Sequence, residues 1–364
     1  MRLKRLVLKN FRNLEETDIS PAENLNLIVG LNAAGKTNLC ESIYYAAKGG
    51  LLKGERQRDL IQWNQPHTSL DLYVQTDHIR IFLNDSAQSK VMEYNKQKVR
   101  QHELRSALRA LVLTPDELQI IKGGPDQRRS FIDRGASDLS LEYRVQLAEY
   151  DQVLKRKNML LRLEPVDREQ LAVYNEELAR RGAFLVQRRI AYLAKINTFL
   201  PALYGKLSDK SDKEGALNLQ YETSLKEQSD LQKLKEELIQ LMTENIGKEL
   251  QFGSAQLGPH RDDIDIRIDE RDLRRFGSQG EQKTAMIAIL LGQIQLQYER
   301  YHDYPILILD DVFSELDPER RGRLLDMLPS EIQIFLTNTE LTEELKQRAG
   351  RVYSVENGRV TLTL

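Results

Sequence analysis

One short segment limits the folds open to this chain more than any other. Residues Gly30-Leu31-Asn32-Ala33-Ala34-Gly35-Lys36-Thr37 match the pattern G-x-x-x-x-G-K-[ST] at every fixed position. The apolar run 25–29 before this segment is typical of a buried strand, and residues 38–47 after it carry apolar side chains at helical spacing. Glycines in a strand-to-helix turn let successive N–H groups point inward, which creates an anion-binding cradle. We therefore expect an α/β fold that contains a phosphate-binding P-loop.

Each part of this segment has a predicted role in binding ATP and Mg²⁺. The backbone of residues 30–37 is expected to surround the phosphates, and Lys36 to reach the β- and γ-phosphates. The hydroxyl group of Thr37 is a predicted Mg²⁺ ligand. Cys40, on the following helix, is interpreted as a small core residue, because no histidine partner for a reactive thiol is suggested nearby.

A second segment supplies carboxylates. Residues 306–309 form a continuous apolar run, which is typical of a strand buried on both faces of a parallel sheet, and Asp310 and Asp311 follow directly. In a P-loop fold the strand beside the cradle brings an acidic residue to the Mg²⁺ shell, and Asp310 fits this role. Asp311 is predicted to polarise the attacking water. Asp311, Asp310 and Lys36 are thus the predicted catalytic residues.

The turn at residues 276–282 indicates a second anion site when it is considered together with the P-loop and the acidic strand. It consists mostly of small residues and leads into a helix, so the Ser278 hydroxyl and the N–H groups around Gly280 form a second predicted anion site. Alone, this would be an ordinary helix cap. Its place before the acidic strand resembles the layout of the ATP-binding cassette family. That resemblance implies that Ser278 contacts the γ-phosphate held by another subunit, in a head-to-tail homodimer that encloses two ATP molecules.

Two further segments resemble the same family. Residues 314–317 look like its D-loop, which crosses the dimer interface. Residues 337–339 lie where its switch loop usually carries a histidine, and here they read Thr-Asn-Thr. The missing histidine is a departure from the family pattern, for which Thr337 or Asn338 would be a weaker substitute.

Length and periodicity indicate two domains. Apolar residues follow helical spacing from about residue 126 to 250, which favours an internal helical bundle over a partner-binding face. Residues 209–215 form a polar break, and the alternating isoleucines of 264–268 indicate a strand. We expect an ATP-binding-cassette-type lobe, formed by residues 1–125 and 251–364, with a helical second lobe, residues 126–250, inserted into it.

Composition excludes some classes and leaves others open. With 53 basic and 55 acidic side chains the net charge is −2, which neither indicates nor excludes binding to nucleic acid, since phosphate contacts need only a local basic surface. The single cysteine rules out an internal disulfide and fits a reducing compartment. The apolar runs fall short of a membrane span, and the first residues lack the features of a signal peptide. A cytoplasmic location without membrane contact is expected.

Several longer segments resemble the RecF family of SMC-like ATPases. Residues 8–12 are similar to the start of SMC and RecF proteins, which implies that Arg12 approaches the nucleotide. Residues 115–133, 258–263 and 309–317 look like stretches characteristic of RecF. The separation between the P-loop and Ser278 exceeds what a transporter subunit needs and is far too short for the coiled coils of SMC proteins. The resemblance extends from residue 2 to about residue 360.

This resemblance implies a role in DNA replication and repair. RecF proteins bind DNA at gaps and at junctions of single and double strands, and act with RecR and RecO in loading a recombinase during DNA damage and SOS responses. ATP would close the dimer around DNA, and slow, DNA-stimulated hydrolysis would release it as a switch. A cytoplasmic ATPase subunit of a membrane transporter is the alternative. A clamp whose ATP is never hydrolysed is a third interpretation, supported by the missing histidine and by the short side chain of Asp311.

Overall fold

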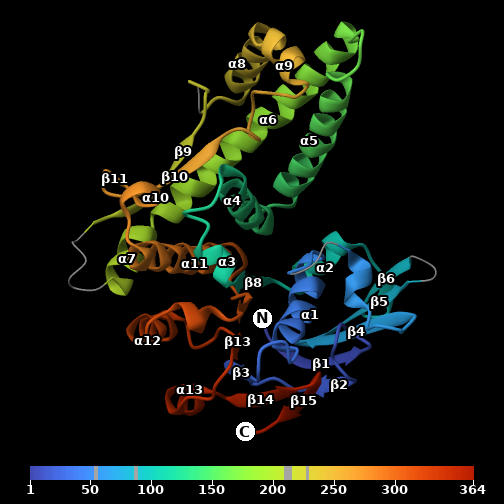
Figure 1. Cartoon of the computed structure of the whole chain (residues 1–364), viewed down its shortest axis with the longest axis vertical. Helices are drawn as coiled ribbons and strands as arrows, with labels where there is room; N and C mark the ends of the chain where they lie inside the picture. The colour runs from blue at the N-terminus through green and yellow to red at the C-terminus, as the bar shows by residue number, and fades with distance from the viewer. Residues whose placement is uncertain (53–55, 86–88, 209–214, 227–228) are drawn as a thin grey trace. The chain divides into compact units, whose positions relative to one another are not determined.

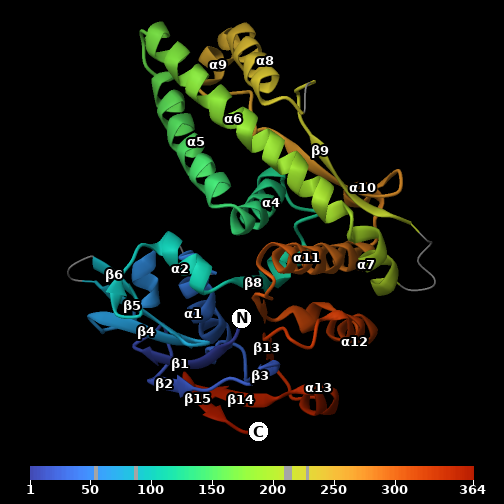
Figure 2. The same cartoon turned by 180° about the vertical axis from the view of Figure 1, so that it is seen from behind.

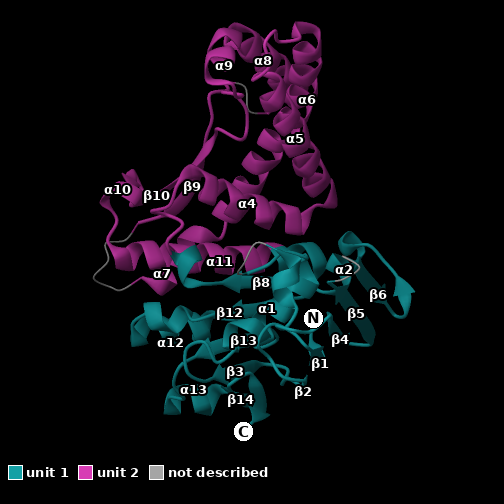
Figure 3. Ribbon diagram, turned by 45° about the vertical axis from the view of Figure 1, so that its right-hand side comes forward, with its two compact units in different colours: residues 1–118, 297–364 teal, residues 119–296 magenta. Residues whose placement is uncertain are grey.

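The computed structural model describes residues 1–52, 56–85, 89–208, 215–226 and 229–364 (Figure 1). The chain divides into two compact units, coloured separately in Figure 3. Unit 1 comprises residues 1–118 and 297–364, and unit 2 comprises residues 119–296. Each unit is described by itself below.

A mostly parallel six-stranded sheet carries the P-loop in unit 1. Its order is β15-β14-β3-β13-β12-β8, and only the β14–β15 pair is antiparallel. The strands are β3 (Leu25–Val29), β8 (Ala110–Leu113), β12 (Ile306–Leu309), β13 (Ile334–Asn338), β14 (Arg351–Glu356) and β15 (Arg359–Leu362). All four residues of β12 are buried, as the continuous apolar run predicts. One expectation is corrected: β12 is not the neighbour of β3, because β13 lies between them.

A second, antiparallel sheet completes unit 1. Its order is β2-β1-β4-β5-β6-β7. The strands are β1 (Leu3–Lys9), β2 (Thr17–Ile19), β4 (His67–Val74), β5 (Asp77–Asn84), β6 (Ser89–Tyr94) and β7 (Gln97–Lys98). Leu8 and Leu72 of this sheet share one buried core with Ile43 of helix α1 (Lys36–Lys48) and with Ile308 and Phe335 of the parallel sheet. Burial of these alternating side chains fixes the face that each strand turns to the core.

Short helices connect the strands of unit 1. They are η1 (Gln57–Leu60), α2 (Gln101–Ala107), α3 (Pro115–Leu118), η2 (Val312–Glu315), α12 (Pro318–Met327) and α13 (Glu343–Arg348). The η2 turn and α12 follow β12, and α1 follows β3, so both predicted site segments leave the parallel sheet into helical structure. The carboxyl ends of parallel strands meet at one edge of a sheet, which is where α/β folds bind ligands.

Unit 2 is mainly helical. It contains α4 (Pro125–Leu139), α5 (Leu141–Leu160), α6 (Arg168–Asn197), α7 (Leu200–Leu207), α8 (Leu231–Glu244) and α9 (Ile246–Phe252). Figures 1 and 2 show α5 lying along α6, which also packs against α8. The leucine spacing that predicts these helices also supplies their contact: Leu178 of α6 and Leu234 and Leu238 of α8 are fully buried.

Unit 2 also contains a small antiparallel sheet, which differs from the predicted domain boundaries. Its strands are β9 (Leu217–Glu222), β10 (Asp263–Ile268) and β11 (Arg271–Asp272), followed by α10 (Leu273–Phe276) and α11 (Gln279–Tyr301). Because β10 pairs with β9 along its whole length, residues 251–296 belong to this unit and not to the lobe that carries the P-loop. The first division falls after Leu118, not after residue 125. Residues 209–214 of the predicted polar break lie outside the described residues.

Within the described residues, no helix combines the length and the apolar character needed to cross a membrane.

Candidate nucleotide-binding site

The P-loop joins β3 to α1 through a turn that needs glycine at two positions. A Cβ atom on Gly30 would lie 2.3 Å from the carbonyl oxygen of Val355. Gly35 has a φ of 120°, and a Cβ atom there would lie 2.8 Å from the side chain of Leu14. Neither position accommodates a larger residue without movement of its neighbours, so the two glycines of the motif are required by the packing of this loop.

Lys36 begins α1 and folds back over its own loop. Its Nζ donates to the carbonyl oxygens of Gly30 at 2.7 Å and Leu31 at 2.9 Å. Burial lowers the pKa of Lys36 below its usual value, while the nearby carboxylates of Asp311 and Asp310 oppose this shift. The cation is therefore held inside the loop whose backbone would surround a phosphate, with two acidic groups close to it.

A chain of hydrogen bonds connects the P-loop to the two aspartates. Asp310 is buried, and its Oδ1 accepts from the hydroxyl of Thr37 at 3.0 Å and from the hydroxyl of Thr337 at 2.9 Å. The same Thr337 oxygen accepts from the backbone N–H of Asp311 at 2.8 Å. Thr337 is the penultimate residue of β13, which lies between the strand before the P-loop and the strand before the aspartates, so its hydroxyl can reach Asp310 and the backbone of Asp311.

The backbone at Asp311 is in the left-handed region, with φ 56° and ψ 21°, and Asp311 is the residue directly before η2. Ser314, in the segment that resembles a D-loop, donates its hydroxyl to the Asp311 carbonyl at 2.6 Å. Asn338 donates to the carbonyl oxygen of Glu340 at 2.8 Å. Of the two predicted substitutes for the switch histidine, Thr337 is therefore the one that contacts the aspartates.

A cavity of about 410 Å³ opens beside these groups. Sequence reasoning identified more than half of its lining, namely Asn32, Ala33, Gly35, Lys36, Thr37, Asp310, Asp311 and Thr337. It missed Asn38, Leu52 and the segment 114–116, whose Asp116 adds a third carboxylate. That segment directly follows β8, which pairs in parallel with β12, so it lies at the same sheet edge as Asp310, and the sequence pattern does not report this pairing.

Arg12 lies elsewhere than its predicted role suggests. Its guanidinium pairs with both carboxylate oxygens of Glu41, at 2.8 and 3.0 Å, and Glu41 is fully buried on α1. Among the described residues that line the cavity, Arg12 is not present. The arginine therefore anchors the first residues of the chain to the helix that follows the P-loop, and a contact with nucleotide stays a prediction.

In unit 2 the predicted signature turn forms a helix cap. The Ser278 N–H donates to Oε2 of Glu281 at 2.7 Å, and the Ser278 hydroxyl accepts from the Glu281 N–H at 3.2 Å. This reciprocal pair is a capping box. Ser278 is exposed, and the carbonyl oxygen of Gly280 accepts from Thr284 at 2.9 Å. The local geometry leaves the turn accessible, and its contact with a γ-phosphate stays a prediction.

The sequence is similar to that of a known protein family. The model of the RecF/RecN/SMC N terminal domain matches residues 2–361. The DNA replication and repair protein RecF of Staphylococcus carnosus is 32% identical over 372 residues, covering 99% of this chain and 100% of the relative. The RecF of Halothermothrix orenii is 33% identical over 375 residues, with 99% of each chain covered.

Solved structures show the same relationship. The recombination mediator protein RecF-ATPrS in the RecFOR pathway has a TM-score of 0.91 at 28% identity, covering 100% of this chain and 98% of that one. An SMC head bound to the C-winged helix domain of ScpA has a TM-score of 0.60 at 16% identity, covering 100% of this chain and 97% of that one. The second likeness is one of fold, and it agrees with the predicted α/β ATPase lobe with an inserted second lobe.

Proposed function

This chain belongs to the RecF family, and on that premise we propose that it is an ATP-dependent DNA-binding protein of recombinational repair and replication-fork recovery. The observation that carries the proposal is the hydrogen-bonded series Thr37–Asp310–Thr337–Asp311 beside the Lys36 cradle. It brings a phosphate-binding loop and two carboxylates together at one sheet edge. The relatives named as DNA replication and repair proteins support this function over that of a transporter subunit.

ATP is the proposed ligand of the cradle. Lys36 would exchange the carbonyl oxygens of Gly30 and Leu31 for the β- and γ-phosphates, which are stronger acceptors for a cation. The backbone N–H groups at the start of α1 favour negative charge at the same place. The solved RecF-ATP structure, 28% identical to this chain, supports this assignment.

Mg²⁺ fits the oxygen atoms that are present. The Thr37 hydroxyl and the Asp310 carboxylate lie 3.0 Å apart, and both are hard oxygen donors of the kind that hold Mg²⁺ together with substrate phosphates. Bound there, the ion would neutralise charge on the phosphates. Thr37 and Asp310 are thus the proposed metal ligands, and Thr337 keeps the Asp310 carboxylate in place for that role.

Slow hydrolysis is proposed to act as a switch. Asp311 lines the cavity beside Lys36, and its carboxylate would orient and polarise the attacking water. In the proposed homodimer, Ser278 of one copy would meet the γ-phosphate held by the other copy, so that ATP closes the dimer around DNA. Gapped DNA and mediators of the RecR and RecO type are the proposed partners, and the cytoplasm the proposed location.

Size-exclusion chromatography with and without ATP, in the presence and absence of a gapped duplex, tests this function. We expect a monomer without nucleotide, a dimer with ATP, and coelution of the dimer with the duplex. A chain that stays monomeric with ATP and binds no duplex or gap would contradict the proposal. Steady-state turnover with and without DNA separates a switch from a clamp that never hydrolyses ATP.

A further inference from the structure

Two segments singled out in the sequence, 115–133 and 258–263, are joined in unit 2, through parts that do not line the nucleotide cavity. The buried guanidinium of Arg128 on α4 donates from Nε and Nη2 to the two carboxylate oxygens of Asp263, at 2.8 and 2.7 Å. Its Nη1 donates to the carbonyl oxygen of Gly123 at 2.6 Å. Such a planar two-point pairing fixes orientation as well as distance. The beginning of β10 is therefore rigidly attached to α4.

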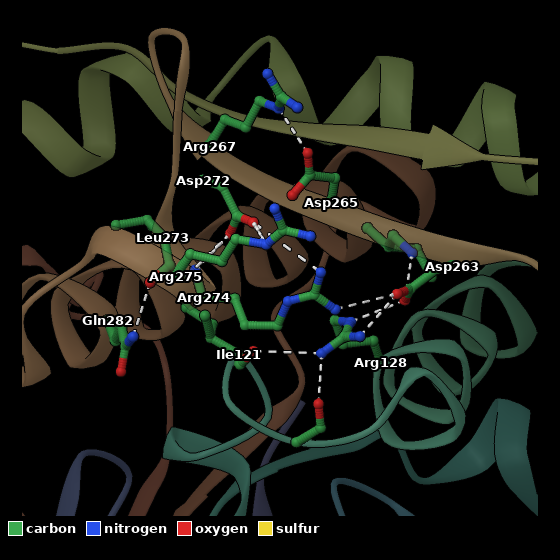
Figure 4. A network of polar contacts seen from close by, with 12 residues as sticks. Ile121, Arg128, Asp263, Asp265, Arg267, Asp272, Leu273, Arg274, Arg275 and Gln282 are labelled. Atoms are coloured by element: carbon green, nitrogen blue, oxygen red, sulfur yellow. Dashed lines mark hydrogen bonds and ion pairs between the residues drawn. The ribbon is translucent and has the colours of Figure 1, made fainter.

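Asp263 also pairs with the short helix before the signature turn. Figure 4 shows Arg274 of α10 approaching the same carboxylate as Arg128, and its Nη1 lies 3.6 Å from Oδ2. Burial would raise the pKa of Asp263, but the hydrogen bonds from Arg128 and the Ile264 N–H outweigh it and hold that pKa below its usual value. The carboxylate thus stays charged and holds both arginines.

Helix α10 has only four residues, so it depends on such external contacts for its position. Asp272 caps it by accepting from the N–H groups of Arg274 at 2.7 Å and Arg275 at 3.3 Å. Gln282 of α11 donates to the Leu273 carbonyl at 2.7 Å. A Cβ atom on Gly277 would lie 2.5 Å from that same carbonyl oxygen. The place of α10 therefore determines where the turn at Ser278 begins.

Arg271 on β11, the strand before α10, contacts the turn directly. Its guanidinium pairs with both carboxylate oxygens of Glu281, and its Nη1 also donates to the Phe276 carbonyl at 3.2 Å. Glu281 is the residue that accepts the Ser278 N–H. The hydrogen bond from Arg271 holds the pKa of Glu281 below its usual value, against the opposing effect of burial. One arginine therefore orients the carboxylate that closes the cap at Ser278.

We propose that Arg271 is a positioning residue for the Ser278 turn, and that the Arg128–Asp263–Arg274 cluster holds the short helix α10 that precedes this turn. Arg271 holds Glu281 against the Ser278 N–H and so keeps the exposed hydroxyl in one orientation, ready for a phosphate held by a second copy of this chain. This inference rests on the proposed function of Ser278. Without Arg271 the turn would lose its fixed conformation and would have to be ordered during dimerisation. The entropy cost of this ordering makes ATP-driven dimerisation weaker.

The variant Arg271→Gln tests this role, with Arg275→Gln as the matched control. Arg275 lies in the same short segment, but its side chain is 69% exposed and pairs with Asp272 at 3.4 Å. We expect Arg271→Gln to weaken ATP-driven dimerisation about tenfold, while ATP affinity of the monomer and the urea midpoint stay near those of the parent. Arg275→Gln should dimerise like the parent, and Arg271→Lys should recover part of the loss.

Amide hydrogen exchange at Ser278 and Glu281 supplies a readout that needs no nucleotide. Exchange at these two amides should be faster in Arg271→Gln than in the parent, and unchanged in Arg275→Gln. Equal exchange in Arg271→Gln and the parent would overturn the positioning role. In Glu281→Gln, which keeps an acceptor oxygen but loses the charge, adding Arg271→Gln should change dimerisation no further. A further loss would show that Arg271 acts by another route.

Comparison with Ser278→Arg separates the two claims. If Ser278→Arg dimerises with ATP like the parent, the proposed function of the turn is wrong. If Ser278→Arg blocks dimerisation while Arg271→Gln dimerises like the parent, the function stands and the positioning role of Arg271 is wrong.

Discussion

In the candidate site, the side chain of Thr337 contacts both Asp310 and Asp311. Its hydroxyl donates to the Asp310 carboxylate and accepts from the Asp311 N–H, so one side chain holds the carboxylate of Asp310 and the backbone of Asp311. We expect Thr337 to affect hydrolysis through these two aspartates and not through a direct contact with the γ-phosphate, which is the role expected of a switch histidine.

Thr337→Val tests this assignment, because valine has nearly the same shape and lacks the hydroxyl. The Asp311 N–H then loses its acceptor and Asp310 loses one donor, which is expected to cost about 1–3 kcal/mol of folding stability. ATP turnover should fall at least about tenfold. Thr339→Val, at an exposed position two residues away, is the matched control. Parent-like turnover in Thr337→Val would mean that the aspartates do not depend on it.

Asp311→Asn tests the proposed water-polarising carboxylate. Asparagine tolerates the left-handed backbone at this position, and the backbone N–H bond to Thr337 is retained, so the variant should fold normally. Turnover should fall by about 10²–10⁴-fold while ATP binding, measured by calorimetry, persists. The ATP-bound dimer should also last longer. Turnover equal to that of the parent would assign the water to another group.

At the level of elements, the loop between α9 and β10 contains a titratable contact. The Tyr150 hydroxyl on α5 lies 2.6 Å from Nδ1 of His260, whose Nε2 lies 3.3 Å from the Ala255 carbonyl. These partners suit a neutral imidazole with its proton on Nε2. Burial lowers the pKa of His260 to about 4. The folded state therefore resists protonation of this ring.

Because the pKa of His260 is lower in the folded chain than in the unfolded chain, the free energy of unfolding should depend on pH. The unfolded chain binds the proton at a higher pH than the folded one, so the stability contribution of His260 is complete above about pH 6.5 and is lost as the pH falls toward 4. The loss amounts to about 3 kcal/mol. Urea unfolding of the parent and of His260→Gln at pH 7, 5.5 and 4.5 measures it. The difference between the two proteins should shrink with falling pH, and a constant difference would contradict a neutral buried His260.

Sequence patterns predicted local elements better than their pairing. The strands predicted at 25–29, 306–309 and 264–268 are confirmed, because the pattern of apolar residues reports which faces of a segment are buried. Periodicity does not report the partner. The insertion of β13 between β3 and β12 therefore went unpredicted, and so did the pairing of β10 with β9 across two intervening helices.

The same limit applied to the candidate site. The motif segments are contiguous in sequence, so Lys36, Thr37, Asp310 and Asp311 could be identified from spacing alone. Asp116 enters the site only because β8 lies in the same sheet as β12. Thr337 was a candidate from its place in the switch segment, but its hydrogen bonds to the two aspartates depend on the strand order. Arg12 and Glu41 are far apart in the sequence, so no local pattern predicts that their side chains pair.

At the scale of the whole molecule, the proposed DNA contact must arise from local basic surface, since the net charge is −2. Binding that depends on phosphate contacts releases counterions, so affinity should fall steeply with salt, with a log–log slope of about −0.9 for each phosphate contacted. Fluorescence anisotropy of a labelled gapped duplex, titrated with ATP at several salt concentrations, measures the slope. A salt-insensitive affinity would contradict binding through the DNA backbone.

The central claim is that two copies of this chain complete each other's ATP sites, and a mixing experiment tests it most directly. Lys36→Ala damages the cradle, and Ser278→Arg places a bulky side chain where the turn must meet a phosphate. A mixed dimer of the two variants holds one site with both parts intact and one with both damaged. We predict that each variant by itself fails to dimerise when ATP is added, and that a mixture of the two variants recovers part of the dimer. Ser278→Arg dimerising as well as the parent, or a mixture with no recovery, would contradict the shared site.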